Sequence, residues 1–156
     1  YTQIENIVSL FESEKYNKFV GFAAGRMGYS LKSFVMRLDH MGFNSYMIGD
    51  TNFPRVDNNT VAFINSSSGE TKTNILYAEQ AVSMGAFTVL LTCSKGSTLN
   101  NLCDVSIFYQ PLCSKQIMKS LYEQFSLVVF DYICSCIIER MNLSIDIIEN
   151  NHSISE

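Results

Sequence analysis

Six consecutive residues in the middle of the chain have the types that bind a phosphate group. Residues 66–71 read Ser-Ser-Ser-Gly-Glu-Thr and lie between a short apolar run and a helical pattern. Hydroxyl groups donate hydrogen bonds, glycine lets the backbone approach a ligand closely, and a helix N-terminus presents free N–H groups. One interpretation of this segment, the serine loop, is an anion cradle. The other is simple capping of the helix, with Ser67 or Ser68 as the N-cap residue.

A glycine-containing loop follows the first apolar run of the chain. Residues 23–28 read Ala-Ala-Gly-Arg-Met-Gly, which lacks the GxGxxG spacing of a dinucleotide site. One interpretation is a tight turn between a strand and a helix. The other is a second wall of the anion site, in which Arg26 offers its planar set of donors to sugar or phosphate oxygens.

Both loops belong to a pattern in which short apolar runs alternate with helical segments. The apolar runs predict buried strands at residues 18–23, 44–48, 61–64, 86–92 and 105–108. Apolar residues at helical spacing predict helices around residues 4–11, 31–38 and 75–82. This alternation predicts an α/β fold with a mostly parallel sheet that is covered on both faces. The two loops then lie at the carboxyl ends of strands, where open sheets bind ligands.

The C-terminal part of the chain is predicted to be helical from Pro111 to near its end. Residues 125–138 are apolar apart from Asp131 and a few small polar residues, and they are fewer than the roughly 20 that a membrane span needs. We therefore expect a buried helix and no membrane association. Because residues 117–141 are apolar on more than one face, we expect the sheet and a partner subunit to cover this helix.

Length and composition predict one domain over residues 1–156. A start at Tyr1 instead of Met suggests that a few N-terminal residues are missing. A net charge of -4 without a basic patch argues against nucleic-acid binding. The five cysteines include no CxxC pair, and His40 and His152 are far apart in sequence, so we expect no metal site. Free thiols and the lack of a cationic leader predict a cytoplasmic protein.

Taken together, these segments resemble the sugar isomerase (SIS) domain family, and within it the 6-phospho-3-hexuloisomerases. Residues 23–28 are similar to the family's Gly-Ala-Gly-Arg-Ser-Gly, and residues 66–71 to its Ser-Gly-Ser-Gly-Glu-Thr. Residues 35–43 resemble its Ala-Met-Arg-Leu-x-His-Leu-Gly-Phe. Residues 122–124 resemble its Phe-Glu-Gln, and residues 152–156 its terminal His-x-x-x-Glu. The motifs keep their order over nearly the whole chain.

The resemblance implies a three-layer α-β-α sandwich with a five-stranded parallel sheet of the flavodoxin-like type, assembled as a homotetramer or dimer. It implies an isomerase that interconverts a 3-hexulose 6-phosphate and fructose 6-phosphate through an enediol, without a metal or organic cofactor. Glu123 corresponds to the family's presumed catalytic base, and His152 to a second acid/base residue that reaches the site of a neighbouring subunit. The residues expected to bind the phosphorylated hexose are Gly25, Arg26, Ser66, Ser67, Ser68, Gly69 and Thr71.

The chain departs from the family's pattern at four positions. Met27 replaces a serine, Ile117 a proline, Lys119 a glycine, and Ser67 a loop glycine. These differences leave two alternatives open, an isomerase of another sugar phosphate and a sugar-phosphate-binding module without turnover. Such modules are fused to DNA-binding domains, and the lack of a helix-turn-helix region here favours the enzyme.

Overall fold

The computed structural model describes residues 2–109 and 115–152. All five predicted strands are present, and the three helices predicted before the C-terminal segment are present within a few residues of their expected bounds. One short helix, α4, was not predicted. The elements in chain order are α1 (Thr2–Glu12), β1 (Lys18–Phe22), α2 (Met27–His40), β2 (Ser45–Met47), β3 (Thr60–Asn65), α3 (Lys72–Ser83), β4 (Phe87–Thr92), α4 (Thr98–Leu102), β5 (Val105–Phe108), α5 (Ser120–Met141) and α6 (Ile145–Asn150).

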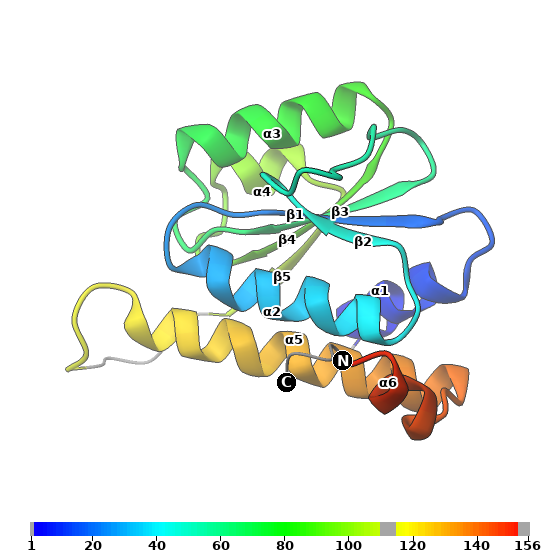
Figure 1. Ribbon diagram of the computed structural model, residues 1–156. Coiled ribbons are helices and arrows are strands. Elements are labelled where there is room, and N and C mark those ends of the chain that lie inside the picture. The colour runs from blue at the N-terminus through cyan, green and yellow to red at the C-terminus, as the bar shows by residue number, and fades with distance from the viewer. Residues whose placement is uncertain (1, 110–114, 153–156) are drawn as a thin grey trace.

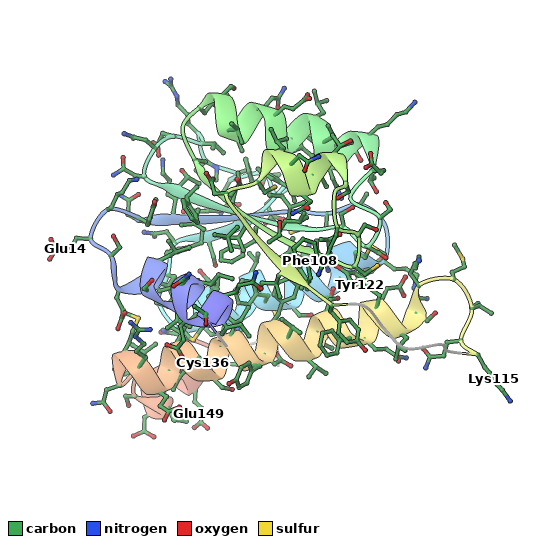
Figure 2. All side chains as sticks on the ribbon, turned by 180° about the vertical axis from the view of Figure 1, so that it is seen from behind. Glu14, Phe108, Lys115, Tyr122, Cys136 and Glu149 are labelled. Carbon is green, nitrogen blue, oxygen red and sulfur yellow. The ribbon has the colours of Figure 1, made fainter. Side chains whose placement is uncertain are left out.

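The five strands form one parallel sheet in the order β2-β1-β3-β4-β5. Helices α3 and α4 cover one face, and α1, α2 and α5 cover the other (Figures 1 and 2), which confirms the three-layer α-β-α sandwich. The chain leaves β1 toward one edge of the sheet and returns to place β3 on the other side of β1. A parallel sheet opens a crevice at such a switch point, outside the carboxyl ends of the two strands. The loops after β1 and β3 therefore border the same crevice.

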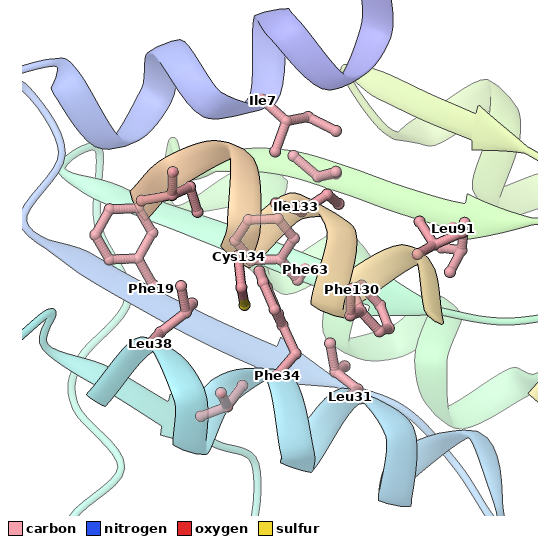
Figure 3. Packing of buried hydrophobic residues seen from close by; sticks show 14 of the residues in the cluster. Ile7, Phe19, Leu31, Phe34, Leu38, Phe63, Leu91, Phe130, Ile133 and Cys134 are labelled. Carbon is pink, nitrogen blue, oxygen red and sulfur yellow. The ribbon is translucent and has the colours of Figure 1, made fainter. Parts of the chain in front are cut away.

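Aromatic packing fixes α2 and α5 against the centre of the sheet. All six residues of β3 are buried, as expected for a strand with helices on both faces. The Phe34 ring of α2 lies 5.1 Å from the Phe63 ring of β3 and 4.8 Å from the Phe130 ring of α5, measured between centroids. Figure 3 shows α5 lying between α1 and α2 with this cluster beneath it. The N-terminal turns of α2 and α5 are thus held side by side.

The C-terminal segment, predicted to be helical from Pro111 to near its end, forms two helices, and residues 115–119 are not helical. Helix α5 begins at Ser120 and ends at Met141, and the separate helix α6 follows. Asn142 has a left-handed backbone (φ 51°), and the Leu143 N–H bonds to the carbonyl of Ile138, which closes α5 as in a Schellman motif. Asparagine tolerates this conformation better than most residues do. Pro111 lies outside the described residues.

Within the described part of the chain, α5 alone has the length and apolar composition that crossing a membrane requires. Its inner face is that of a core helix, with Phe130 and Ile133 buried. Its outer face exposes Leu127, Val128 and Tyr132 in the single chain. The expectation that the C-terminal helix is buried against the rest of the fold therefore holds for the inner face of α5.

Candidate active site

The serine loop continues directly from β3 and turns its hydroxyls in two directions. Ser66 and Ser67 are buried, while Ser68 is exposed. The Ser66 hydroxyl accepts the Gly69 N–H at 3.2 Å, and the Ser67 hydroxyl lies 3.0 Å from the Cys93 sulfur. These two side chains shape the loop from within. Ser68 is the serine of this loop whose side chain faces solvent.

Helix α3 begins after the serine loop, at Lys72. Its N-cap residue is Thr71, and among the described residues the Thr71 side chain makes no capping hydrogen bond. The capping interpretation, which assigned the N-cap to Ser67 or Ser68, is therefore wrong, because both residues lie in the loop before the helix. The first-turn N–H groups of α3 and the partial positive charge of its N-terminus remain suited to an anion.

The acidic residue of the serine loop is turned away toward α4. The Glu70 carboxylate accepts hydrogen bonds from the backbone N–H and the hydroxyl of Thr98, each at 2.8 Å. These two bonds lower the pKa of Glu70. The negative charge of Glu70 thus compensates the N-terminus of α4 instead of repelling an anion at α3.

A buried pair of polar side chains links the end of β3 to the first turn of α5. The Tyr122 hydroxyl lies 2.8 Å from the Asn65 side-chain oxygen and 2.7 Å from the backbone oxygen of Leu91, and these two acceptors share its single proton. Burial raises the pKa of Tyr122 far above its usual value, so the phenol keeps its proton. The first turn of α5 is therefore tied to β3 and β4.

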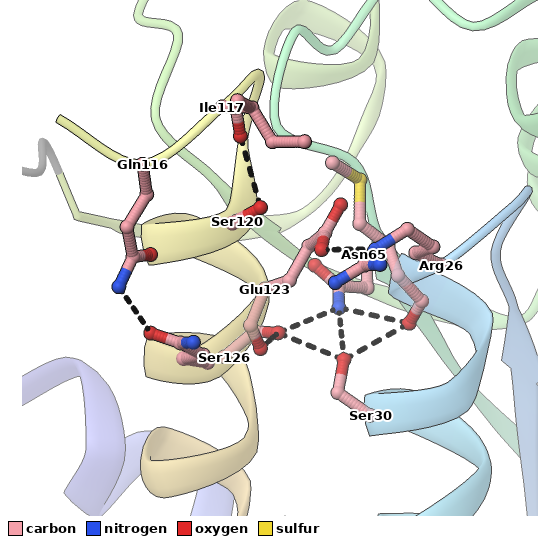
Figure 4. A network of polar contacts seen from close by, with 10 residues as sticks. Arg26, Ser30, Asn65, Gln116, Ile117, Ser120, Glu123 and Ser126 are labelled. Atoms are coloured by element: carbon pink, nitrogen blue, oxygen red, sulfur yellow. Dashed lines mark hydrogen bonds and ion pairs between the residues drawn. The ribbon is translucent and has the colours of Figure 1, made fainter. Parts of the chain in front are cut away.

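The same asparagine connects α5 to α2, as Figure 4 shows. Its amide nitrogen lies 3.0 Å from the Ser30 hydroxyl, 3.2 Å from the Ser126 hydroxyl and 3.1 Å from the backbone oxygen of Met27. The two serine hydroxyls are 2.8 Å apart, and that of Ser126 donates to the backbone oxygen of Glu123. The network fixes the starts of α2 and α5 at the carboxyl edge of the sheet.

This network brings Arg26 and Glu123 together. The Arg26 Nε donates to the Glu123 Oε2 at 2.5 Å, and Figure 4 shows the two side chains meeting above Asn65. The Glu123 side chain is 14% exposed and the Arg26 side chain 72% exposed. Gly25, just before the arginine, has a positive φ of 62° and forms the turn into α2.

An open groove of about 330 Å³ starts at this ion pair and runs between α2 and α5. A carboxylate, a guanidinium and several hydroxyls thus face one space. The groove residues are Arg26, Tyr29, Ser30, Ser33, Glu123, Gln124 and Leu127.

The structure separates His152 from Glu123 within one chain. The His152 ring lies 4.8 Å from the ring of His40, which is the last residue of α2, and the neighbouring Asn151 donates to the backbone oxygen of His40. Arg26 and Glu123 lie at the other end of α2, and 14 helical residues span about 20 Å. Glu156, the other end of the C-terminal motif, lies outside the described residues.

The remaining titratable groups show no cluster suited to a metal. Within residues 2–109 and 115–152, no three His, Cys, Asp or Glu side chains gather as metal ligands would. Burial raises the pKa of the Cys103 thiol to about 11 and that of Cys134 to about 12. Both thiols are therefore protonated at neutral pH. Cys113 lies outside the described residues.

The asparagine–tyrosine–serine network was missed by the sequence analysis. The available signal was a polar residue at the end of an apolar strand and a serine within an apolar helix. Buried polar groups need partners, so Asn65 and Ser126 could have been expected to meet a third polar group.

Replacing Tyr122 with phenylalanine is expected to lower the free energy of unfolding by about 1–3 kcal/mol, because the buried hydroxyl proton that Asn65 and Leu91 share as acceptors is lost. Thermal denaturation followed by circular dichroism measures the change. Tyr29→Phe, at an exposed tyrosine of α2, is the matched control and should leave stability unchanged. Equal melting temperatures for Tyr122→Phe and the wild type would contradict a stabilising role for the network.

The chain is similar to known proteins in sequence and in structure. A family model described as the SIS domain matches residues 16–130. The 3-hexulose-6-phosphate isomerase of Methanocaldococcus jannaschii is 30% identical over 130 residues, which cover 83% of this chain and 72% of that protein. The enzyme of the same name from Bacillus subtilis is 33% identical over 140 residues, with 83% and 75% coverage.

A solved structure extends the similarity to the whole fold. It is that of a hypothetical protein from Methanococcus jannaschii, for which the structure infers a molecular function of 3-hexulose-6-phosphate isomerase. This chain superposes on it with a TM-score of 0.91 and 27% identity, covering 97% of this chain and 85% of the other. The matched region of the family model contains the serine loop, Arg26 and Glu123, and the chain belongs to the SIS domain family.

Proposed function

We propose that the chain is a sugar-phosphate isomerase that interconverts 3-hexulose 6-phosphate and fructose 6-phosphate through an enediol. The observation that carries the proposal is the place of the Glu123 carboxylate. It is largely buried, faces the groove, and is tied through Ser126 and Asn65 to the strand that leads into the serine loop. The isomerisation needs a base at the carbon-bound proton and a site that holds the phosphate group, and the end of β3 links the two candidates, Glu123 and the serine loop. The relatives named 3-hexulose-6-phosphate isomerase support the choice of substrate.

The reaction moves a carbonyl group between two neighbouring carbons. The Glu123 carboxylate takes the proton from C2 of the 3-hexulose, and the C–H electron pair forms a double bond between C2 and C3. The π-electron pair of the C3 carbonyl moves onto O3, and O3 receives the proton that the O2 hydroxyl gives up. The electron pair left on O2 then forms the new carbonyl bond at C2. The electron pair of the C2–C3 double bond takes the proton from the Glu123 carboxyl and forms the C3–H bond. Proton transfer by a positioned group of this kind contributes roughly 10²–10⁴-fold in rate.

The phosphate group of the sugar is proposed to bind at the start of α3. The exposed hydroxyl of Ser68, the hydroxyl of Thr71 and the first-turn N–H groups of α3 are its donors. Ser66, Ser67 and Gly69 contribute by setting the path of the loop, which the buried serine side chains hold. Binding energy from this remote group orients the sugar over Glu123.

Replacing Ser68 with alanine is expected to weaken the binding of fructose 6-phosphate about tenfold, because one hydrogen bond to a charged group is lost. The binding of unphosphorylated fructose should not change. Titration followed by protein NMR measures both affinities. Ser83→Ala, at an exposed serine near the end of α3, is the control. Equal weakening of both sugars would contradict a phosphate contact at Ser68.

Incubation of the protein with fructose 6-phosphate in D₂O, followed by NMR, tests the reaction itself. Deuterium at C3, or the appearance of a 3-hexulose phosphate, is the expected result. Deuterium at C1 would instead indicate an isomerase of an aldose phosphate. If neither exchange nor a new sugar appears while the sugar phosphate still shifts protein resonances, the protein binds sugar phosphates without turning them over.

We further propose that copies of the chain assemble into a homo-oligomer in the cytoplasm. Val128 is 62% exposed on the outer face of α5, beside Leu127 and Tyr132. An apolar face of this kind is typical of a subunit interface. Assembly would also give His152 a role, because it lies at the opposite end of α2 from Glu123 of its own chain and acts, in this proposal, at the site of a neighbouring copy. Size-exclusion chromatography with light scattering measures the subunit number.

A further inference from the structure

The two side chains of the Arg26–Glu123 ion pair differ strongly in solvent exposure. The carboxylate is largely buried, whereas the guanidinium lies on its solvent side. The contact runs from Arg26 Nε to a single carboxylate oxygen, Oε2, at 2.5 Å. Arg26 therefore lies between one oxygen of the proposed base and solvent.

Both partners are attached to the same buried network. The backbone oxygen of Met27, next to Arg26, accepts from Asn65 and Ser30. The backbone oxygen of Glu123 accepts from Ser126, whose hydroxyl meets that of Ser30. Ion pairs between mobile surface side chains contribute little to stability. Here the backbone on each side is fixed, so the ion pair gives the carboxylate one orientation.

That orientation suits a base that acts on a carbon-bound proton. With Oε2 held by the Nε–H group, Oε1 is the oxygen left to receive the proton. A guanidinium does not lose its own proton in proteins, so it orients the carboxylate without competing as a base. An arginine engaged with the base in this way is also withdrawn from the phosphate group of the substrate.

We infer that Arg26 is a positioning residue for Glu123, in place of the substrate contact that the sequence predicted. The inference rests on the proposed function, because it assigns Arg26 to the proton-transfer step of that reaction. If Arg26 positions the base, its loss changes kcat but not the binding of the phosphate group. Loss of Arg26 lowers kcat, because a base misplaced by about 1 Å slows transfer by roughly 100-fold, and it leaves phosphate binding intact.

The experiment compares the wild type with Arg26→Ala and Arg26→Lys in the exchange of fructose 6-phosphate at C3. For Arg26→Ala we expect kcat to fall about 100-fold, with KM and the inhibition constant of inorganic phosphate changed less than twofold. Guanidinium chloride at about 20 mM should restore part of the lost kcat, because it returns the missing planar donor. Arg26→Lys should lie between the two, since an ammonium pairs with the carboxylate but does not fix its plane. Arg37→Ala, at an exposed arginine of the same helix, should match the wild type.

Three outcomes would overturn the inference, and they are distinguishable. A raised KM and a weakened phosphate inhibition at unchanged kcat would make Arg26 a phosphate ligand. An unchanged kcat for Arg26→Ala, in a wild type that exchanges at C3, would overturn the positioning role alone. A wild type without exchange at any carbon would overturn the proposed function and this inference together.

Discussion

Replacing Glu123 with glutamine should abolish deuterium exchange into fructose 6-phosphate, with a loss of at least 10²-fold and up to about 10⁴-fold. Glutamine has nearly the same shape, and its amide oxygen can still accept the hydrogen bond from Arg26. It cannot take a proton from carbon. The phosphate cradle of the serine loop is untouched, so the affinity for fructose 6-phosphate should persist. Exchange followed by NMR and titration of protein resonances measure the two effects on one sample.

The control for this substitution lies on the same helix. Glu139 is exposed near the C-terminal end of α5, and Glu139→Gln removes the same charge without reaching the groove. We expect that variant to exchange deuterium at the wild-type rate. Unchanged turnover in Glu123→Gln would remove Glu123 from the mechanism, and the base would have to be sought among other groups that face the groove.

The sheet could be predicted because its strands are buried on both faces. A strand covered by helices on each side is an uninterrupted apolar run, and residues 61–64 and 86–92 show this in the sequence itself. Parallel strands also place the loops after β1 and β3 at one edge, so the serine loop and Arg26 could be assigned to one crevice before the structure was known.

The contact between Arg26 and Glu123 could not be predicted, because the two residues are 97 positions apart. Their meeting depends on how α5 packs between α1 and α2, and periodicity says nothing about that arrangement. The directions of Ser66 and Ser67 are similarly outside the reach of a local pattern. Three serines in a row look alike in the sequence, but the fold buries two of them and exposes the third.

Both the backbone conformation and the packing require a glycine at the glycine position of the serine loop. Gly69 has a φ of 68°, in the left-handed region that disfavours other residues. A Cβ atom built there would overlap the Ser97 side chain, which caps α4 by accepting the N–H of Asn100. An alanine at this position must therefore adopt an unfavourable backbone and also displace the cap of the neighbouring helix.

We expect Gly69→Ala to lower the free energy of unfolding by about 2–3 kcal/mol, of which about 1–2 kcal/mol is the left-handed backbone and about 1 kcal/mol the lost cap. The shifted loop should also weaken fructose 6-phosphate binding more than Ser68→Ala does, because the loop's backbone moves as well as one hydroxyl. Gly96→Ala is the matched control, since Gly96 has a φ of 72° and, among the described residues, no atom within 4 Å of the added Cβ. It should cost the backbone component alone and keep the affinity for the sugar phosphate. Chemical denaturation and ligand titration of the two variants measure the difference, and equal effects of both would show that the contact with Ser97 does not shape the loop.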